Sequence, residues 1–323
     1  MKSSNIGGQA VLEGIMMKNK DSYAVAVRKP DQTIAMKVDT YKSVSPVSAL
    51  TKIPFVRGVF NFIDSMVLGM STLSYSASFF EDEDDSSEGA QAGAETTQAD
   101  CLSEAEKEAA RKKEERTESL IMGGTMLFSL VMVIALFTVL PSFVAKLAVE
   151  KGIVHGYTGR AVIEGVLKVL IFVVYILLIS RMKDIQRVFM YHGAEHKCIN
   201  CIEQGLPLTV ENVRKSSRQH KRCGTSFLLF VVIISILVGM FIHIDVLWLR
   251  VVVRVALFPL IAGISYEIIR LAGNSENPII GLLSVPGLLT QKLTTKEPED
   301  DMIEVAITAV EAVFDWEAFE ATL

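Results

Sequence analysis

Long apolar runs dominate the second half of the chain. Four of them are close to the roughly 20 residues that a helix needs to cross a bilayer: residues 120–140, 161–180, 225–244 and 246–271. We expect Pro141 to end the first span. The third and fourth spans are so close in sequence that they must form an antiparallel hairpin. The pattern therefore predicts a mainly α, polytopic membrane protein with about four transmembrane helices.

A different periodicity precedes the spans. Hydrophobic residues alternate with polar or small ones at 23–27 and again at 34–38, on either side of a Lys-Pro-Asp-Gln turn, which predicts a β-hairpin. We expect residues 1–52 to form a small α+β cytoplasmic lobe. In residues 53–80 apolar residues recur at helical spacing on one face, which is typical of a helix that lies on the membrane or packs on the bundle rather than crossing.

The remaining segments are polar or short. Residues 81–118 contain fourteen acids and five bases and begin without periodicity, so we expect an acidic disordered linker followed by a charged helix. The apolar stretch 279–289 is too short to span and is expected at the membrane interface. Residues 301–314 predict a terminal amphipathic helix. We therefore divide the chain into the lobe 1–52, the amphipathic helix 53–80 and the acidic linker with its charged helix 81–118. The first two spans (119–181), the loop 182–224, the last two spans (225–271) and the tail 272–323 follow.

Charge orients these segments. The formal net charge is −5, and residues 81–118 alone contribute −9, so the rest of the chain carries +4. The basic residues concentrate in 182–224 and just before the first span. Basic loops face the cytoplasm. We therefore expect a multi-pass protein of the plasma membrane with both termini and the 182–224 loop cytoplasmic. The lipid bilayer is its partner, another membrane or cytosolic protein is a further candidate, and nucleic acid is not expected.

Candidate chemistry gathers in the 182–224 loop. Three of the five histidines and three of the four cysteines lie between positions 192 and 223, in a compartment that keeps thiols reduced. We expect residues 182–204 to continue the second span as a helix, ended at Gly205. His192 and His196 then share one helical face and can hold one metal ion, with Glu195 beside them. This is the H-x-x-E-H order of inverted zinc hydrolases, in which the glutamate activates water.

A second pair can complete the site. His220 and Cys223 are three residues apart just before the third span, and imidazole with thiolate favours zinc. Glu267 is a possible additional ligand, although a pair with Arg270 is the simpler explanation. Cys198 and Cys201 are further possible ligands or, less simply, a redox pair. The alternative to a metal site is that these side chains are interfacial packing groups. Charges within the spans (Glu164, Lys168, Arg250, Arg254) indicate either mutual pairing or a polar cavity.

Four motifs carry a family resemblance: GGQAVLEGIMMK, HGAEHK, LTVENVRKSSRQHKRCGTSFL and PGLLTQKLTTKEPED. With them nearly the whole chain outside the acidic linker resembles the YqhQ-like family of bacterial membrane proteins, a family of unknown function labelled a predicted metal-dependent enzyme. The resemblance implies a metal-dependent activity. The positions that match the family motifs are His192, Glu195, His196, His220 and Cys223. The resemblance does not extend to Cys198 or Cys201.

Two functions of different classes follow. The first is a metal-dependent hydrolase at the cytoplasmic membrane face, with zinc held by His192, His196, His220 and Cys223, and with Glu195 as general base or further ligand. Four protein ligands would leave no position for chemistry, so catalysis requires one of them to be outside the shell or the metal to be five-coordinate. The second is a non-catalytic assembly or interaction protein with a structural metal. A transporter is a third, weaker reading because the four spans show no repeats.

Overall fold

The computed structural model describes residues 3–45, 52–80, 120, 123–242, 244, 246–275 and 277–322. The chain divides into two compact units. Unit 1 comprises Met1–Phe80, Phe172–Ile242 and Arg254–Leu323, and unit 2 comprises Glu81–Ile171 and His243–Val253. The predicted acidic linker lies outside the described residues.

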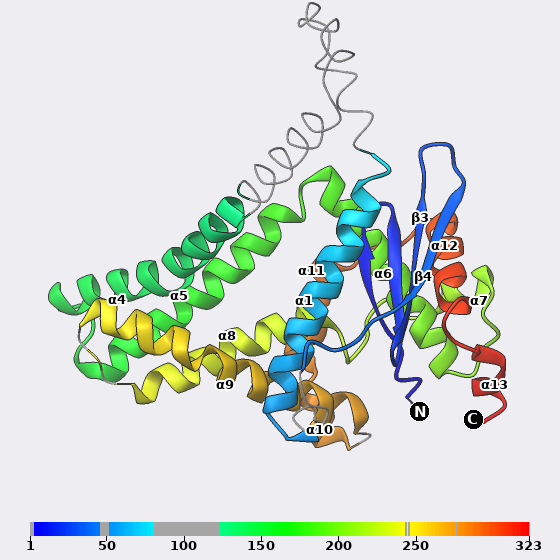
Figure 1. Ribbon diagram of the computed structural model, residues 1–323. Helices are drawn as coiled ribbons and strands as arrows, with labels where there is room; N and C mark the ends of the chain where they lie inside the picture. The colour runs from blue at the N-terminus through cyan, green and yellow to red at the C-terminus, as the bar shows by residue number, and fades with distance from the viewer. Residues whose placement is uncertain are drawn as a thin grey trace, which may run out of the picture. The chain divides into compact units, whose positions relative to one another are not determined.

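Four described helices are long and apolar enough to cross a membrane: Gly123–Glu150, Gly156–Ile179, Gly224–Phe241 and Trp248–Gly273. The prediction of a mainly α polytopic protein with four spans is confirmed. Figure 1 labels the corresponding helices as α4 (Leu140–Glu150), α5 (Gly156–Ile179), α8 (Gly224–Phe241) and α9 (Leu247–Asn274).

The first span does not end at Pro141, so that prediction was wrong. A π-helical turn, η3 (Ala135–Val139), directly precedes α4, and Pro141 stands in the first turn of α4. Proline lacks an N–H group and its ring crowds the carbonyl of the preceding turn. A wider π turn at this point accommodates both defects within a continuing helix. The span therefore runs on to Glu150.

The helix that carries the candidate chemistry is separate from the second span, contrary to the predicted continuation. Helix α5 ends at Ile179, and α6 (Lys183–Glu203) starts after a turn in which Met182 is extended, with ψ of 133°. The end of α6 matches the prediction, because Gly205 has a φ of +69°, which glycine adopts without strain. The turn lets α6 take a direction independent of α5.

The N-terminal region forms a four-stranded antiparallel sheet with the strands in sequence order. The strands are β1 (Gly7–Val11), β2 (Gly14–Asn19), β3 (Ser22–Arg28) and β4 (Ile34–Thr40). The predicted hairpin is present as β3 and β4. The first two strands escaped prediction because β2 buries Gly14 to Met17 without a break, so no alternation is visible in the sequence.

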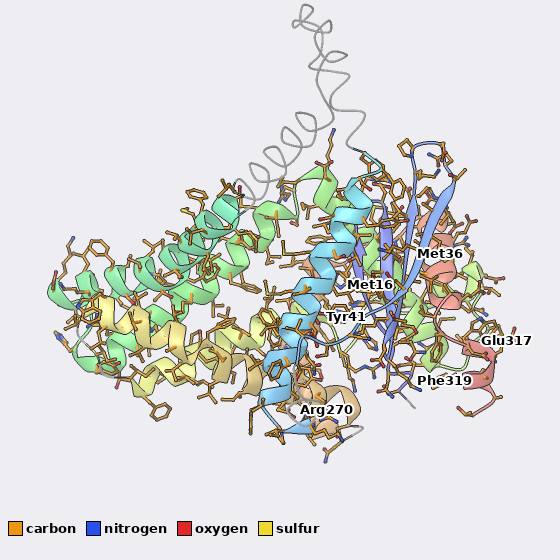
Figure 2. All side chains as sticks on the ribbon, viewed as in Figure 1. Met16, Met36, Tyr41, Arg270, Glu317 and Phe319 are labelled. Carbon is orange, nitrogen blue, oxygen red and sulfur yellow. The ribbon has the colours of Figure 1, made fainter. Side chains whose placement is uncertain are left out.

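Both faces of this sheet are covered (Figure 1). On one face Met16 and Val25 pack with Leu68 of α1 (Val56–Ala77). On the other face Ile15 and Met17 pack with residues of α6 and α12 (Asp300–Glu311). Figure 2 shows Met16 between the sheet and α1, whereas Met36 on β4 is exposed. The sheet is thus the middle layer of a three-layer lobe, which explains why β2 is apolar on both sides.

Helix α1 also packs on the spans that belong to unit 1. The ring of Phe62 lies 5.4 Å from that of Phe227 on α8 and 5.9 Å from that of Phe258 on α9. Gly263 allows a close approach, since a Cβ there would stand 2.6 Å from the Phe55 carbonyl oxygen. Of the two placements that the sequence left open, the structure shows packing on helices of the bundle.

The remaining helices follow the spans or connect α6 to α8: α7 (Val210–Lys215), α10 (Pro278–Leu282), α11 (Val285–Thr294), α12 and α13 (Trp316–Glu320). The short apolar stretch at 279–289 is divided between α10 and α11, with a turn between them, and Pro286 stands in the first turn of α11. Helix α12 buries Ile303 and Val310 fully, as its amphipathic pattern predicted.

The charges within unit 2 pair with one another. Arg250 lies 3.9 Å from Glu164 and has an exposed fraction of 2%. Glu164 also accepts a hydrogen bond from Ser142, and Arg250 donates to the carbonyl of Ile244. Pairing removes much of the cost of a charge at membrane depth. Mutual pairing therefore accounts for Glu164 and Arg250.

Candidate metal centre

Helix α6 runs through the middle of the lobe. It contacts β1, β2, α7, α12 and α13, and thirteen of its residues are buried, among them Glu195, His196 and Lys197. A further contact comes from the segment that follows α11, because the N–H of Lys296 donates to the carbonyl of Phe189 at 2.9 Å. Gly193 makes this approach possible, since a Cβ there would overlap the Lys296 carbonyl oxygen. The glycine of the HGAEH sequence thus has a structural reason.

Three of the predicted ligands come together at one point. One ligand atom from each of His192, His196 and Cys223 lies within 4.8 Å of the other two. Nε2 of His192 is 3.2 Å from Sγ of Cys223, and the two imidazole rings are 4.4 Å apart between centroids. Ligand atoms on one tetrahedral zinc ion are separated by about 3.3–3.8 Å. Small side-chain movements would therefore allow this cluster to hold a metal ion.

Backbone carbonyls fix the orientation of both imidazoles. Nδ1 of His192 lies 2.9 Å from the Thr294 carbonyl oxygen, and Nδ1 of His196 lies 2.8 Å from the Arg218 carbonyl oxygen. A carbonyl oxygen only accepts hydrogen bonds, so each Nδ1 must carry the hydrogen. Nε2 is then the ring nitrogen available to a metal in both residues.

Two imidazoles lower the pKa of the Cys223 thiol. Burial alone would raise its pKa, but His192 and His196 outweigh burial and hold the pKa well below its ordinary value. Burial alone would lower the pKa of His192, but Cys223 raises it to about 9. Both shifts favour an imidazolium–thiolate pair between His192 and Cys223. Because Cys223 directly precedes α8, the helix N-terminus adds to the stabilisation of the thiolate.

Glu195 is buried beside the cluster. Burial raises the pKa of its carboxyl group, an effect that His196 and His192 partly offset. Strand β1 covers it, since a Cβ on Gly8 would stand 2.9 Å from Cγ of Glu195. Within the described part of the chain no hydrogen bond of its side chain is found, which is unusual for a buried carboxyl group.

His220 lies near the cluster but faces a different partner. Its Nε2 is 3.4 Å from a carboxylate oxygen of Glu203, and its ring centroid is 5.9 Å from that of His196. Glu203 also accepts from Arg222 and from the backbone N–H of Ser4. Burial alone would raise the pKa of Glu203, but these partners lower it to about 2. His220 therefore belongs to a buried ion-pair network at the end of α6, and its role as a ligand stays a prediction.

The other possible ligands lie elsewhere. Cys198 and Cys201 are buried in the core that α6 shares with α12, and neither joins the His192, His196 and Cys223 cluster. Glu267 forms an ion pair with Arg57 of α1 at 2.5 Å and accepts from the N–H of Phe55, so the expected pair with Arg270 was wrong. Arg57 is separated from Glu267 by 210 positions, which is why spacing within the fourth span favoured Arg270.

The structure also adds residues that the sequence did not assign. The carbonyl of Thr294 orients His192, Gly8 lies against Glu195, and Gly193 allows the segment after α11 to approach α6. All three lie within the motifs that carry the family resemblance. The four motifs lie far apart in sequence, yet all contribute to the same unit: β1 and β2, α6, the segment from α7 to α8, and the segment from α11 to α12. Their joint occurrence was the signal that could have found these residues.

Comparison with known proteins identifies a relative and a family for this chain. The chain is 38% identical over 313 residues to "Uncharacterized protein YqhQ" from Bacillus subtilis (strain 168), covering 97% of this chain and 93% of that protein. No solved structure matches the chain. Residues 53–316 match the model of a family described as "Protein of unknown function (DUF1385)". The chain therefore belongs to this family, since the family model covers most of its length and the relative is similar over nearly the whole chain.

Proposed function

We propose that the protein is a zinc-dependent membrane hydrolase whose centre is His192, His196 and Cys223. One observation carries the proposal: both imidazoles donate from Nδ1 to a backbone carbonyl, which leaves Nε2 free to face the sulfur of Cys223. Core histidines that only pack have no reason to share this arrangement. Two imidazole nitrogens and one sulfur suit zinc rather than magnesium or calcium.

Three protein ligands are the number typical of catalytic zinc centres. A zinc ion bound here would supply a Lewis acid and lower the pKa of water at the site. His220 stands outside the cluster in its contact with Glu203, which removes the conflict between a four-ligand shell and catalysis. Binding of zinc would displace the proton that His192 shares with Cys223.

Glu195 is the proposed general base. It lies one residue before His196 and three after His192 on α6, so its carboxylate can receive a proton from the attacking water. Its raised pKa improves its match to neutral pH, as a general base requires. The side chain is not committed to a hydrogen bond within the described residues, so its oxygens are available for this role.

The proposed site faces the cytoplasm. The N-terminal sheet, α6 and the C-terminal helix α12 pack into one core, so these segments lie on the same side of the membrane. Four spans are consistent with this arrangement. The basic residues of 182–224 favour the cytoplasmic side of the plasma membrane.

Metal content and turnover of the purified full-length protein test the proposal. We expect about one zinc ion per chain in wild type, and a large loss in His192→Ala and in Cys223→Ser. His155→Ala and Cys201→Ser are matched controls outside the cluster and should keep the metal. Glu195→Gln should keep zinc and lose turnover on a panel of chromogenic ester, amide and phosphoester substrates. Well-folded wild-type protein free of metal, prepared without chelator, would refute the proposal.

A structural zinc site in an assembly protein is the second candidate. Burial favours it, because His196 and Cys223 have exposed fractions of 1% and 5%. In that case zinc would join α6 to the start of α8 and hold the lobe to the third span. The Cys223→Ser variant would then lose lobe stability together with metal, and the Glu195→Gln variant would resemble wild type in every measurement.

A further inference from the structure

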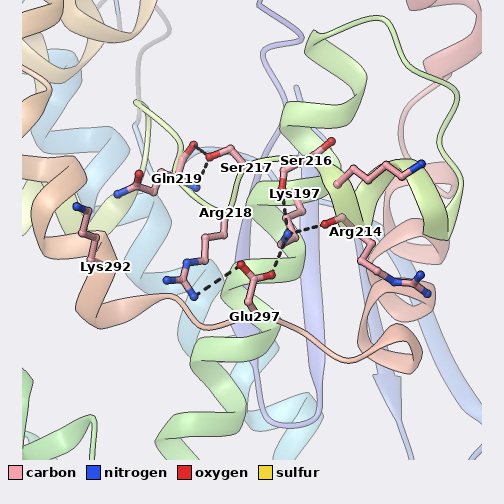
Figure 3. A pocket seen from close by; sticks show the side chains of 9 residues that line it. Lys197, Arg214, Ser216, Ser217, Arg218, Gln219, Lys292 and Glu297 are labelled. Atoms are coloured by element: carbon pink, nitrogen blue, oxygen red, sulfur yellow. Dashed lines mark hydrogen bonds and ion pairs between the residues drawn. The ribbon is translucent and has the colours of Figure 1, made fainter.

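A cavity of about 630 Å³ lies beside α6, outside the set of residues that form the metal cluster (Figure 3). Its wall comes from three parts of unit 1: Lys197 on α6, the segment 214–219, and the segment from Lys292 to Glu297. Five of its nine lining residues are cations and one is an acid. Such an excess of positive charge in a concave surface attracts anions.

The one acid is already neutralised. Glu297 forms an ion pair with Lys197 at 2.9 Å, and Lys197 also donates to the carbonyls of Arg214 and Ser216 at 2.8 and 2.9 Å. The side chain of Lys197 has an exposed fraction of 5%. Lys197 is therefore a fixed part of the wall, and its ion pair with Glu297 offsets the negative charge of that carboxylate.

The other four cations differ in whether an acidic side chain pairs with them. Arg214 pairs with Asp300 and Lys215 with Glu211, both at exposed positions. Arg218 has only a 3.8 Å contact with Glu297. For the Lys292 amine no partner is found in the part of the chain that the structure describes. In Figure 3 the side chains of Lys292 and Arg218 lie to the left of Glu297 and Lys197, and Arg214 lies to the right of them. Because Glu297 also pairs with Lys197, Arg218 and Lys292 are the least compensated cations of the cavity.

We propose that this cavity binds a phosphate group, with Arg218 and Lys292 as its principal contacts. A guanidinium matches two phosphate oxygens at once, and an ammonium adds a strong point charge. Ser217 and Gln219 at the same wall supply further hydrogen-bonding groups. The volume exceeds that of a phosphate ion, so the ligand has room for a substituent. A carboxylate offers fewer oxygens and less charge to the same cations.

Two sources can provide such a group. The first is a free phosphate or phosphate ester. The second is a lipid headgroup, because Lys292 lies on α11, and Gln291 of that helix donates to Ser226 in the first turns of span α8. The proposal does not require zinc. The cavity and the metal cluster nevertheless share two segments, since the carbonyls of Arg218 and Thr294 hold the two cluster imidazoles.

Binding to detergent-solubilised full-length protein tests the proposal. The probes are inorganic phosphate, dihexanoyl phosphatidic acid and dihexanoyl phosphatidylcholine, titrated by calorimetry, with zinc content measured on the same samples. The variants are Arg218→Glu and Lys292→Glu. Lys221→Glu is the matched control, because Lys221 is an exposed lysine of the same basic segment that does not line the cavity.

We expect saturable binding of phosphate or phosphatidic acid, weakened at least about tenfold by Arg218→Glu and by Lys292→Glu and little changed by Lys221→Glu. Binding of inorganic phosphate indicates a free phosphate ligand, and binding of phosphatidic acid alone indicates a lipid headgroup. No saturable binding of either probe overturns the proposal, as does an equal loss in Lys221→Glu, which would indicate unspecific charge attraction. Zinc content reports on the metal proposal separately, so the two can fail independently.

Discussion

Helix α6 is polar and mostly buried, whereas helix α4 is apolar and mostly exposed, which is the reverse of the pattern in a soluble protein. Helix α6 carries charged and polar residues along its length, yet 13 of its 21 residues are buried. Helix α4 is the more apolar of the two, yet only 4 of its 11 residues are buried and none of these is charged. Lipid can cover an apolar helix, whereas a buried polar helix needs a partner for each polar group.

The two regions also differ in how their buried polar groups are paired. Several polar side chains of α6, among them His192, His196 and Lys197, have partners in α7, in α11 and in the segment before α8. Such satisfied networks are costly to assemble and fix one geometry. In unit 2 the buried charges Glu164 and Arg250 satisfy one another. The lobe is therefore the region in which substitutions should have the larger and more specific effects.

Among the charged groups, the largest effect should come from the ion-pair network at the end of α6. The pKa of Glu203 is about 2, against an ordinary value of 4.5, which corresponds to about 3 kcal/mol. Since the pKa in the folded state is lowered, this stabilisation is present above pH 4.5 and is lost as the pH falls towards 2. Glu203→Gln should therefore lower the free energy of unfolding by about 3 kcal/mol at pH 7.

Urea unfolding, followed by Trp316 fluorescence in a Trp248→Phe background, measures this change. Glu311→Gln on α12 is the control, because Glu311 is exposed and should change stability little. The difference in unfolding free energy between the parent protein and the Glu203→Gln variant should narrow between pH 4.5 and the lowest pH at which the protein stays folded. A difference that is independent of pH would show that the network contributes nothing through charge.

A smaller effect should follow from Gly193→Ala. The new Cβ would push the Lys296 carbonyl away from α6 and with it Thr294, which orients His192. Overpacking of this kind costs about 1–3 kcal/mol. We expect the variant to bind zinc at least tenfold more weakly in a competition assay with a chelator. Gly224→Ala, where a Cβ meets nothing within 4 Å, should bind zinc as wild type does; equal affinities in both variants would contradict the positioning role of Thr294.

The smallest effect should come from the span surface. Leu127 in the first span has an exposed fraction of 61%, so Leu127→Ala should change the free energy of unfolding by less than about 0.5 kcal/mol and leave zinc content intact. Ile199→Ala on α6, by contrast, removes a fully buried side chain and should cost about 2–5 kcal/mol. The same urea measurement compares them. Similar costs at the two positions would mean that another chain covers the first span.

Much of this organisation was predictable from local pattern. The four spans, the hairpin at β3 and β4, the end of α6 at Gly205 and the shared face of His192 and His196 follow from periodicity and turn residues alone. Contacts between distant segments were not predictable in this way. Pro141 was expected to end a helix because proline usually does so. Whether a π turn can form before it and let the helix continue is not visible in the local sequence. Glu267 was assigned a neighbour in sequence, whereas its partner Arg57 stands on another helix.

The site shows the same division. Spacing identified His192, Glu195, His196 and Cys223 as candidates, but it could not separate Cys223 from His220, since both lie in one short segment. Only the fold shows that Cys223 joins the two α6 histidines while His220 contacts Glu203. The orientation of the imidazoles depends on main-chain carbonyls of Thr294 and Arg218, and no side-chain pattern encodes such a contact.

X-ray absorption at the zinc edge, on full-length protein purified without chelator, tests the central claim most directly. The account predicts a first shell with one sulfur at about 2.3 Å and two imidazole nitrogens at about 2.0–2.1 Å, completed by one further light atom. Cys223→Ser should remove the sulfur contribution, and Cys201→Ser should leave it unchanged. A shell with two or more sulfurs, or one made only of oxygens, would contradict a centre built from His192, His196 and Cys223.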